Sequence, residues 1–177
     1  MRHNMLSFLA TVFVLAVMPS TGLSQQSTNV VVFDFMRTIE VSKAGQAAAS
    51  QLKLKEQTIA SELEKIDRQI LAFQQRLNTQ RLTLNAAALQ DLTKKIDDLQ
   101  IEKKRTGEDL TKEYQKLQYD LVEKMKQDVL TVVGEIAKEK KYQLVLEISS
   151  GGIAYFEENF DITVEVIRRY DASGSGR

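Results

Sequence analysis

The sequence predicts an α+β protein in which a long antiparallel coiled-coil hairpin is inserted into a small β-rich base with a short C-terminal helix. Apolar residues recur with heptad spacing through much of residues 42–140, which is typical of a coiled coil. Short β-branched and aromatic runs lie on either side of that region. The only proline, Pro19, precedes it, so proline interrupts neither of the expected helices. We therefore expect an elongated arm on a small base.

Residues 1–24 have the pattern of a cleaved secretory signal peptide. Arg2 and His3 lie before an apolar run at residues 6–18, and the small residue Ser24 marks the expected cleavage point. The run is shorter than the ~20 apolar residues that a membrane-spanning helix needs, so an uncleaved anchor is the less favoured alternative. We therefore expect export, followed by removal of this segment.

The composition excludes several classes of catalytic site. Lysine and arginine together number 24, as do aspartate and glutamate, and the chain has no cysteine. Loss of residues 1–24 removes Arg2 and the only histidine, His3, which leaves 23 basic and 24 acidic residues. Such a chain lacks the usual bases and nucleophiles at neutral pH and the preferred ligands of zinc and copper. We therefore predict that the protein is no enzyme and has no cofactor or metal site.

The outgoing helix of the arm is predicted from a heptad pattern. A short strand at residues 30–35 precedes it, and Ser42 is the expected N-cap. The apolar residues follow one another at alternating spacings of four and three: Ile59, Leu63, Ile66, Ile70, Phe73 and Leu77. This seam indicates that the helix packs along one stripe against a partner helix.

The return helix begins after a tip predicted at residues 79–85, where the apolar spacing lapses and Asn85 provides an N-cap. Its seam consists of Leu89, Leu92, Ile96, Leu99, Leu110, Tyr114, Leu117, Leu121, Met125, Val129, Val132 and Ile136. Lys103 and Thr106 take seam positions midway, beside Gly107. Polar seam residues weaken packing while fixing register, and glycine weakens a helix, so we expect the arm to be softest there.

The base is predicted to comprise residues 25–41 and 141–177, on both sides of an arm at residues 42–140. Within it, strands at residues 142–148 and 153–156 are expected to form a β-hairpin around a loop that contains two glycines. The arm is thus expected to interrupt a small β-forming unit rather than to precede or follow one.

A short helix is expected to complete the base at residues 162–170. Asp161 is its expected N-cap, and Val164, Ile167 and Tyr170 are expected to face inward. The expected core also contains four aromatic residues: Phe33, Phe35, Tyr155 and Phe156. Three short strands and one short helix give a core that is marginal on its own. We therefore expect the protein to associate with itself through exposed strand edges.

Two segments of the chain carry a pattern known from other proteins. The first, VVVFDFMRTIEVSKAG at Val30–Gly45, is a strand followed by a helix with a Ser-x-x-Gly step. The second is YQLVLEISSGGIAYFEENFDITVEVIRRYD at Tyr142–Asp171, which contains Tyr155 and an Asp-Ile-Thr step beginning at Asp161. Together with the charged coiled coil between them, these segments resemble the Skp/OmpH-like family of periplasmic chaperones.

The resemblance implies a homotrimer in the periplasm whose β base is shared among the subunits. Three hairpin arms would surround a central cavity and hold unfolded outer-membrane proteins without ATP, which prevents their aggregation in transit to the outer membrane. The alternative is a structural or tethering coiled-coil protein of the cell envelope. An export adaptor would carry substantial domains on both sides of its hairpin, and the short flank before this arm disfavours that class.

Basic residues gather on the distal half of the expected arm. From Arg68 to Lys95 there is one acidic residue, Asp91, and there are five basic ones: Arg68, Arg76, Arg81, Lys94 and Lys95. These five are the candidate residues for contact with acidic client segments or with an anionic membrane surface. An ordinary solvated helix surface is the alternative. The chain shows no motif that reads nucleic acid, so nucleic acid is not an expected partner.

Asp34 and Glu147 form the one carboxylate pair that resembles a catalytic arrangement. Both lie on expected strands. The sequence offers neither a third polar partner for them nor a pocket-forming architecture around them. We therefore interpret them as charges at strand ends rather than as an acid–base pair.

Overall fold

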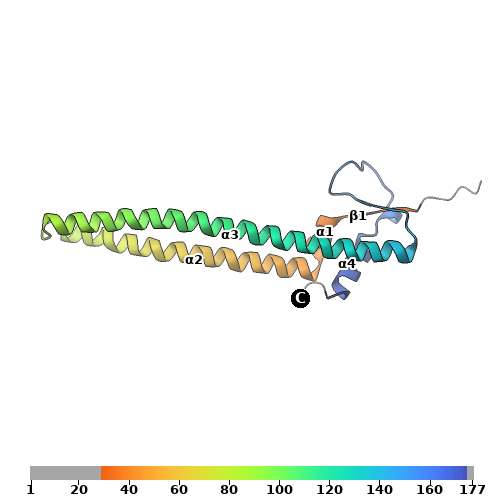
Figure 1. Cartoon of the computed structure of the whole chain (residues 1–177), viewed down its shortest axis with the longest axis horizontal. Helices are drawn as coiled ribbons and strands as arrows, with labels where there is room; N and C mark the ends of the chain where they lie inside the picture. The colour runs from red at the N-terminus through yellow and green to blue at the C-terminus, as the bar shows by residue number, and fades with distance from the viewer. Residues whose placement is uncertain (1–28, 175–177) are drawn as a thin grey trace, which may run out of the picture.

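The computed structural model describes residues 29–174 of the chain. Its elements follow in the order β1 (Val30–Phe33), α1 (Phe35–Val41), α2 (Lys43–Gln80), α3 (Ala86–Lys140), β2 (Leu144–Glu147), a 3₁₀ turn (Glu158–Phe160) and α4 (Thr163–Ala172). Figure 1 shows α2 and α3 as an antiparallel hairpin that projects far from the sheet and the short helices. The predicted α+β class, with a long hairpin on a small base, is confirmed. The predicted signal peptide lies outside the described residues.

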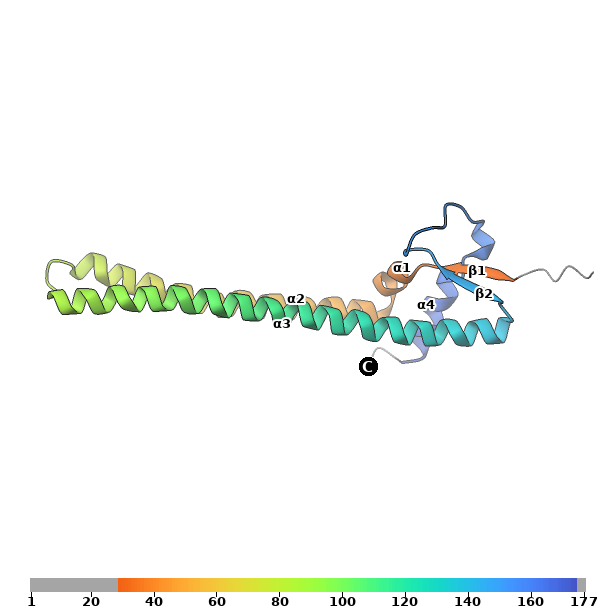
Figure 2. The same ribbon diagram turned by 45° about the horizontal axis from the view of Figure 1, so that its top comes forward.

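The arm is long because both of its helices are uninterrupted. α2 has 38 residues and α3 has 55, so at ~1.5 Å per residue they extend about 57 Å and about 80 Å. Both N-termini are capped as predicted: the Ser42 side chain accepts the N–H of Gly45, and the Asn85 side chain accepts the N–H of Ala88. Figure 2 shows that α3 continues past the start of α2 and runs beneath the sheet. The longer helix therefore belongs to the arm and to the base at once.

The chain changes direction between α1 and α2, and Gly45 makes this step possible. A Cβ at that position would lie 1.6 Å from the carbonyl oxygen of Ile39, so no larger residue fits. The Ser42 side chain is fully buried in the step, where its hydroxyl donates to the same carbonyl at 3.2 Å. At the N-terminus of α2, the N–H of Lys43 donates to the carboxylate of Asp171 at 2.9 Å. These contacts set the angle at which the arm leaves the base.

The heptad seam is buried between α2 and α3, as predicted. Every residue of both predicted seams is buried or half-buried. The distal part packs around Ile66, Ile70 and Ile96, with Phe73, Leu77 and Leu99 beside them. Midway along the arm, the half-buried Lys103 reaches across to Asp67 on α2, with 2.7 Å between ammonium and carboxylate. The charged seam residue is thus paired across the hairpin.

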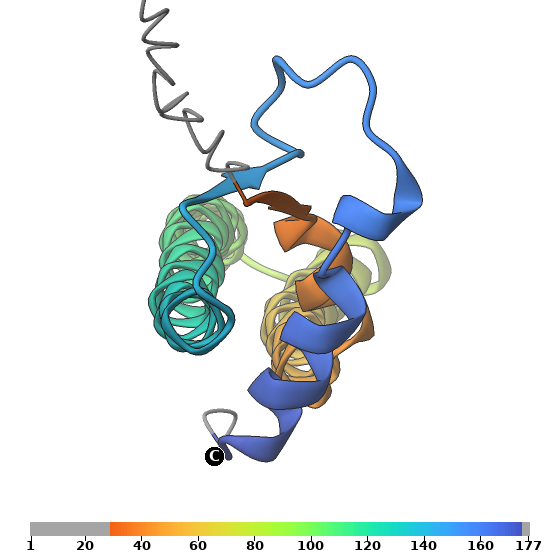
Figure 3. The same cartoon turned by 90° about the vertical axis from the view of Figure 1, so that its right-hand side faces the viewer.

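The core of the base surrounds the last turns of α3. Val129 and Ile136 of α3 and Val166 of α4 have no exposed surface. The same cluster contains Val31, Phe33, Ala44, Val132, Val133, Ile162 and Tyr170. The end-on view in Figure 3 shows α4 beside α1 and the start of α2, with the segment between β2 and α4 arching away from the helices. One core therefore joins β1, α2, α3 and α4.

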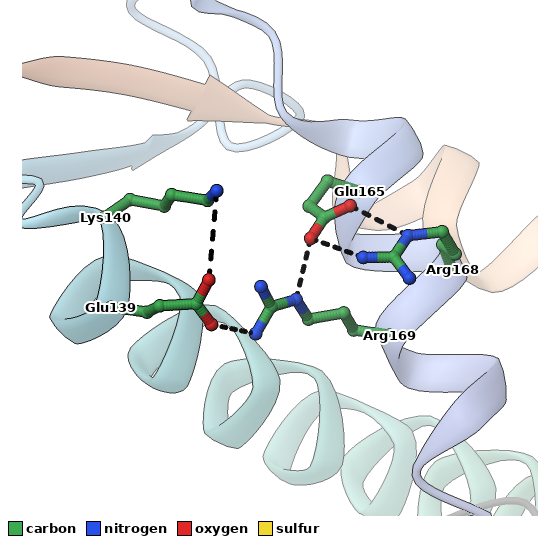
Figure 4. A network of polar contacts seen from close by, with 5 residues as sticks. All are labelled: Glu139, Lys140, Glu165, Arg168 and Arg169. Carbon is green, nitrogen blue, oxygen red and sulfur yellow. Dashed lines mark hydrogen bonds and ion pairs between the residues drawn. The ribbon is translucent and has the colours of Figure 1, made fainter.

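Ion pairs connect α4 to the end of α3 (Figure 4). The guanidinium of Arg169 lies 2.6 Å from the carboxylate of Glu139 and 2.7 Å from that of Glu165. Glu165 also pairs with Arg168 at 2.8 Å, and hydrogen bonds from Arg168 and Arg169 lower the pKa of Glu165 to about 2. The side chains of Glu139 and Arg168 are largely exposed, so solvent screens their ion pairs. The network therefore orients α4 more than it stabilises the base.

The predicted β-hairpin of residues 142–148 and 153–156 is wrong. Only residues 144–147 form a strand, and this strand pairs in parallel with β1. At the other edge of β1, the N–H of Ile162 donates to the carbonyl of Val32 at 2.9 Å. Both edges of β1 are therefore occupied by segments that the arm separates from it in sequence.

No hairpin forms because the chain after β2 continues to the other edge of β1, where it bonds at residue 162, instead of folding back along β2. Gly151 has φ of 84° and Gly152 has φ of 96°, a backbone region that glycine adopts without strain. The chain leaves the sheet after these glycines, and residues 152–157 have no regular structure within the single chain. Tyr155, which we expected in the core, is for this reason 81% exposed.

Two predicted boundaries also shift. The first strand ends at Phe33 instead of residue 35, because the side chain of Asp34 accepts the N–H of Arg37 at 2.9 Å and caps α1. The last helix begins at residue 163, and its inward positions are therefore Thr163, Val166 and Tyr170. The expectation that Val164 faces inward is wrong, since this side chain is 71% exposed.

Candidate functional site

Two surfaces, rather than one compact centre, are the candidate functional features of this chain. Among residues 29–174, no group of three or more histidine, cysteine or carboxylate side chains is placed to hold a metal ion. No helix in this part of the chain is both long enough and apolar enough to cross a membrane. The two surfaces are a furrow along the middle of the arm and an apolar face of the sheet.

The mid-arm furrow, as we call the first surface, runs between α2 and α3. It consists of two hollows of about 740 Å³ and about 270 Å³, and Thr111 lines both of them. The larger hollow has residues of both helices in its wall, among them Leu63, Lys103, Lys104, Gly107 and Glu108. Two contacts across the hairpin lie along the furrow: the ion pair between Lys103 and Asp67, and a 2.8 Å hydrogen bond from the Tyr114 hydroxyl to the Glu56 carboxylate.

The apolar sheet face, as we call the second surface, lies opposite the core of the base. Val31 and Phe33 of β1 belong to the core, whereas Val30, Val32 and Leu146 line a hollow of about 340 Å³ on the other side. Aromatic residues of the arching segment complete this hollow: Tyr155, Phe156 and Phe160. The outer edge of β2 has no partner strand within residues 29–174. An apolar surface and an open strand edge therefore lie together on the base.

Comparison with known proteins identifies the family. Residues 29–170 match the model of the family described as outer membrane protein (OmpH-like). The chain belongs to the OmpH-like family. The match extends from β1 through the whole arm to α4, so it includes both candidate surfaces, and the resemblance predicted from the sequence is confirmed.

A solved structure shares the OmpH-like fold of this chain. It is the crystal structure of a protein from Caulobacter crescentus, provisionally described as an outer membrane chaperone (OmpH-like). The two chains superpose with a TM-score of 0.75 at 21% sequence identity, over 82% of this chain and 85% of that chain. At this identity the likeness shows a shared fold. No curated protein matches the sequence closely enough to count as a relative.

The five candidate basic residues of this OmpH-like arm are all exposed on its distal half. Three of them contact neighbours on their own helix: Arg68 pairs with Glu64 at 2.8 Å, Lys95 pairs with Asp91 at 2.7 Å, and Arg76 donates to Gln80 at 3.1 Å. Arg81 and Lys94 make no ion pair within residues 29–174. No contact between described residues joins two of the five, so they are a dispersed basic surface and not a binding pocket.

Sequence reasoning missed the mid-arm furrow, although it singled out the residues at its centre. The pattern showed that Lys103, Thr106 and Gly107 interrupt the seam, but it gave no reason to expect a hollow. The signal that could have predicted the hollow is that Gly107, which has no side chain, lies opposite Leu63 in the antiparallel hairpin. The position of Gly107 opposite Leu63 becomes visible only when the register of the two helices is known.

The two carboxylates considered as a catalytic pair both bind the N-terminus of α1. Asp34 caps the helix, and Glu147 accepts the N–H of Phe35 at 3.3 Å. Glu147 also accepts hydrogen bonds from the hydroxyl and backbone N–H groups of Ser149 and Ser150. Burial alone would raise the pKa of Glu147, but these hydrogen bonds outweigh it and lower the pKa to about 2. Glu147 is therefore an anchor for the start of the arching segment.

We predict that this anchor makes the base sensitive to acid. A carboxyl whose pKa falls on folding contributes stability that is fully present above its ordinary pKa of 4.5 and is lost as the pH falls toward about 2. Glu147→Gln should lower the free energy of unfolding by about 1–2 kcal/mol at pH 7 and should flatten its decline between pH 4.5 and pH 2. Urea unfolding followed by tyrosine fluorescence at several pH values measures both effects.

The matched control for this prediction is Glu158→Gln, which changes an exposed carboxylate of the same segment. This variant should show the same pH dependence of the free energy of unfolding as the wild type. If the free energy of unfolding fell equally in Glu147→Gln and in the wild type between pH 4.5 and pH 2, Glu147 would not be the anchor of this segment.

Proposed function

We propose that the protein is an ATP-independent holdase chaperone of the periplasm, exported through residues 1–24, that binds unfolded outer-membrane proteins and prevents their aggregation. The observation that carries this proposal is the OmpH-like match over residues 29–170 of a chain dominated by an open hairpin. The structurally similar protein from C. crescentus is provisionally described as an outer membrane chaperone. A holdase acts by binding the unfolded state through mass action, so it needs binding surface and no reactive group.

The exposed side chains of the arm are suited to weak, distributed binding. Several large apolar side chains outside the seam are half-exposed or more: Leu54, Leu71, Ile101, Tyr119 and Leu130. They are spread along both helices and are separated by charged residues. Many small apolar contacts of this kind hold an unfolded chain without requiring one particular sequence, because the hydrophobic effect is non-directional.

We further propose that the base at residues 25–41 and 141–177 assembles as a homotrimer, from which three arms at residues 42–140 surround a cavity. Three features of the single chain support this assembly: the apolar sheet face, the open edge of β2, and the unpaired segment at residues 152–157. Leu144 is 47% exposed beside them. Strands from neighbouring subunits would remove these edges and cover the apolar surface.

The dispersed basic residues of the distal arm have a separate role in this proposal. They attract acidic segments of a client, or an anionic membrane surface, during the first encounter. At ~0.15 M salt the screening length is ~8 Å, so exposed charges act only over short distances. Charges at the rim of a binding surface affect association rates more than dissociation rates. Retention of the client then depends on the apolar contacts.

The proposed function is tested by aggregation of a denatured β-barrel membrane protein that is diluted from urea without nucleotide. Protein that lacks residues 1–24 should keep the light scattering low at about one assembled trimer per client, because the client is bound faster than it aggregates. A tethering coiled coil would leave the scattering unchanged. That result would contradict the proposal and favour the structural alternative.

An arm that is one heptad shorter provides a graded control for this assay. Residues 71–77 and 93–99 face each other across the hairpin, since Asp67 pairs with Lys103 and Glu56 with Tyr114. Deletion of both segments keeps the seam in phase. The shortened protein should protect a small client as well as the wild type does and should protect a large client less well.

The mass of the protein in solution tests the proposed assembly. Light scattering should give a mass near three subunits, and Tyr155→Asp should shift it toward one subunit, because a charge at the edge of the apolar sheet face opposes its burial. Tyr119→Asp is the matched control: this tyrosine of the arm is 68% exposed, compared with 81% for Tyr155, and its replacement should leave the mass unchanged. A wild-type monomer at micromolar concentration would contradict the trimer.

The encounter role of the basic surface is tested by exchanging four charges at once. Replacement of Arg76, Arg81, Lys94 and Lys95 with glutamine should slow client capture about threefold to tenfold at low salt and should leave client release nearly unchanged. Stopped-flow fluorescence across a salt series measures both rates. The matched control replaces four exposed lysines elsewhere on the arm: Lys53, Lys116, Lys124 and Lys126. Fast release with normal capture would instead identify the basic residues as the site of retention.

A further inference from the structure

The mid-arm furrow extends over about four turns of α3. Its two hollows share Thr111, and their lining residues on α3 run from Gln100 to Tyr114. These two residues are separated by about 21 Å along the helix axis. An extended polypeptide advances ~3.3 Å per residue, so the furrow is long enough for about five residues of extended chain.

Gly107 lines the furrow, and the packing of the hairpin does not require a glycine there. A Cβ at this position would meet only the Leu63 side chain, at an ordinary van der Waals distance of 3.8 Å. Alanine would therefore fit and would favour the helix over glycine. The consequence of the glycine is that half-buried Leu63 stays open to solvent from this side. Together with Ile59 and Ala60 it gives the furrow an apolar floor.

The rim of the larger hollow is mainly basic. Lys103, Lys104 and Lys112 line it, against the single carboxylate of Glu108. Lys103 is held by Asp67, and Lys112 lies 3.2 Å from Asp109 with both side chains largely exposed. Lys104 makes no ion pair within residues 29–174. An acidic side chain beside the furrow would therefore find a free ammonium group next to an apolar floor.

We propose that the mid-arm furrow binds an extended client segment of about five residues in which apolar side chains alternate with polar ones, at least one of them acidic. Alternate side chains of an extended chain point to the same side, so two or three apolar side chains reach the floor formed by Leu63, Ile59 and Ala60. The acidic side chain between them meets Lys104. This inference rests on the proposed holdase function, since it names the class of client segment that the arm selects.

The experiment uses the protein without residues 1–24 and a fluorescein-labelled peptide of alternating valine and glutamate. Fluorescence anisotropy should show saturable binding, and Gly107→Leu should weaken it about tenfold, because the new side chain covers Leu63 and excludes one apolar residue of the peptide. The matched control is Gly134→Ala, at a second glycine within α3 that also has open space around its Cα. This variant should bind the peptide as the wild type does.

Two further measurements separate the furrow from a general change in the arm. Gly107→Ala adds only a Cβ; it should raise the thermal stability of the helices and weaken peptide binding less than Gly107→Leu does. Lys104→Gln should weaken binding of the glutamate peptide several-fold and should leave binding of a valine–glutamine peptide unchanged. Two results would overturn the furrow as the binding site. One is that Gly107→Leu binds the peptide as tightly as the wild type, and the other is that Gly134→Ala loses as much peptide affinity as Gly107→Leu.

The aggregation assay distinguishes the failure of this inference from the failure of the proposed function. If the wild type protects a denatured β-barrel protein while Gly107→Leu binds the peptide normally, the furrow is wrong and the holdase function stands. If the wild type protects no client, the holdase function fails, and the assignment of the furrow to client segments fails with it even when the peptide binds.

Discussion

The burial of the last turns of α3 is the constraint on which the rest of the structure depends. Val129 and Ile136 are completely buried, and the cluster around them takes side chains from β1, α2 and α4. The arm and the base therefore cannot fold independently at this point, because one helix supplies the seam of the first and the core of the second. The buried Ser42–Gly45 step then fixes how α2 returns to that helix.

Outside this core, the molecule leaves much of its apolar surface uncovered, and it does so in two different ways. Along the arm, exposed apolar side chains are single and are separated by charges, which suits transient contacts with many partners. On the base, the apolar sheet face is contiguous and lies beside an open strand edge, which suits one permanent partner. The anchor at Glu147 holds the start of the arching segment, whose aromatic residues line the hollow on this face.

The middle of the arm differs from both of its ends. The distal part packs around Ile66, Ile70 and Ile96, and the proximal part merges with the core of the base. Between them the apolar seam is only half-buried, and polar contacts also join the helices, including a 2.7 Å ion pair between Lys55 and Glu113. Polar contacts between helices specify register at some loss of packing energy. The polar middle therefore aligns the two helices and, at the same place, leaves room for the furrow.

The sequence by itself determined the elements whose signals are local. The heptad spacing from Ile59 to Leu77, the N-caps at Ser42 and Asn85, and the β-branched and aromatic run at residues 30–35 each predicted an element that the structure contains, although the strand ends at Phe33. These signals work because a helix buries one stripe of its own residues and caps its own first turn. The family followed from the order of the two flanking segments around the arm.

Only the tertiary structure decided which segments pair. The expected hairpin at residues 142–156 looked local, yet β2 pairs with β1 across the whole length of the arm, and the chain after β2 continues to the other edge of β1. The furrow likewise depends on Gly107 facing Leu63, and the role of Glu147 depends on the N–H of Phe35. A periodic pattern shows that a segment packs along one face, but it does not show which distant residue each side chain meets, so only the folded register of the helices and strands fixes these contacts.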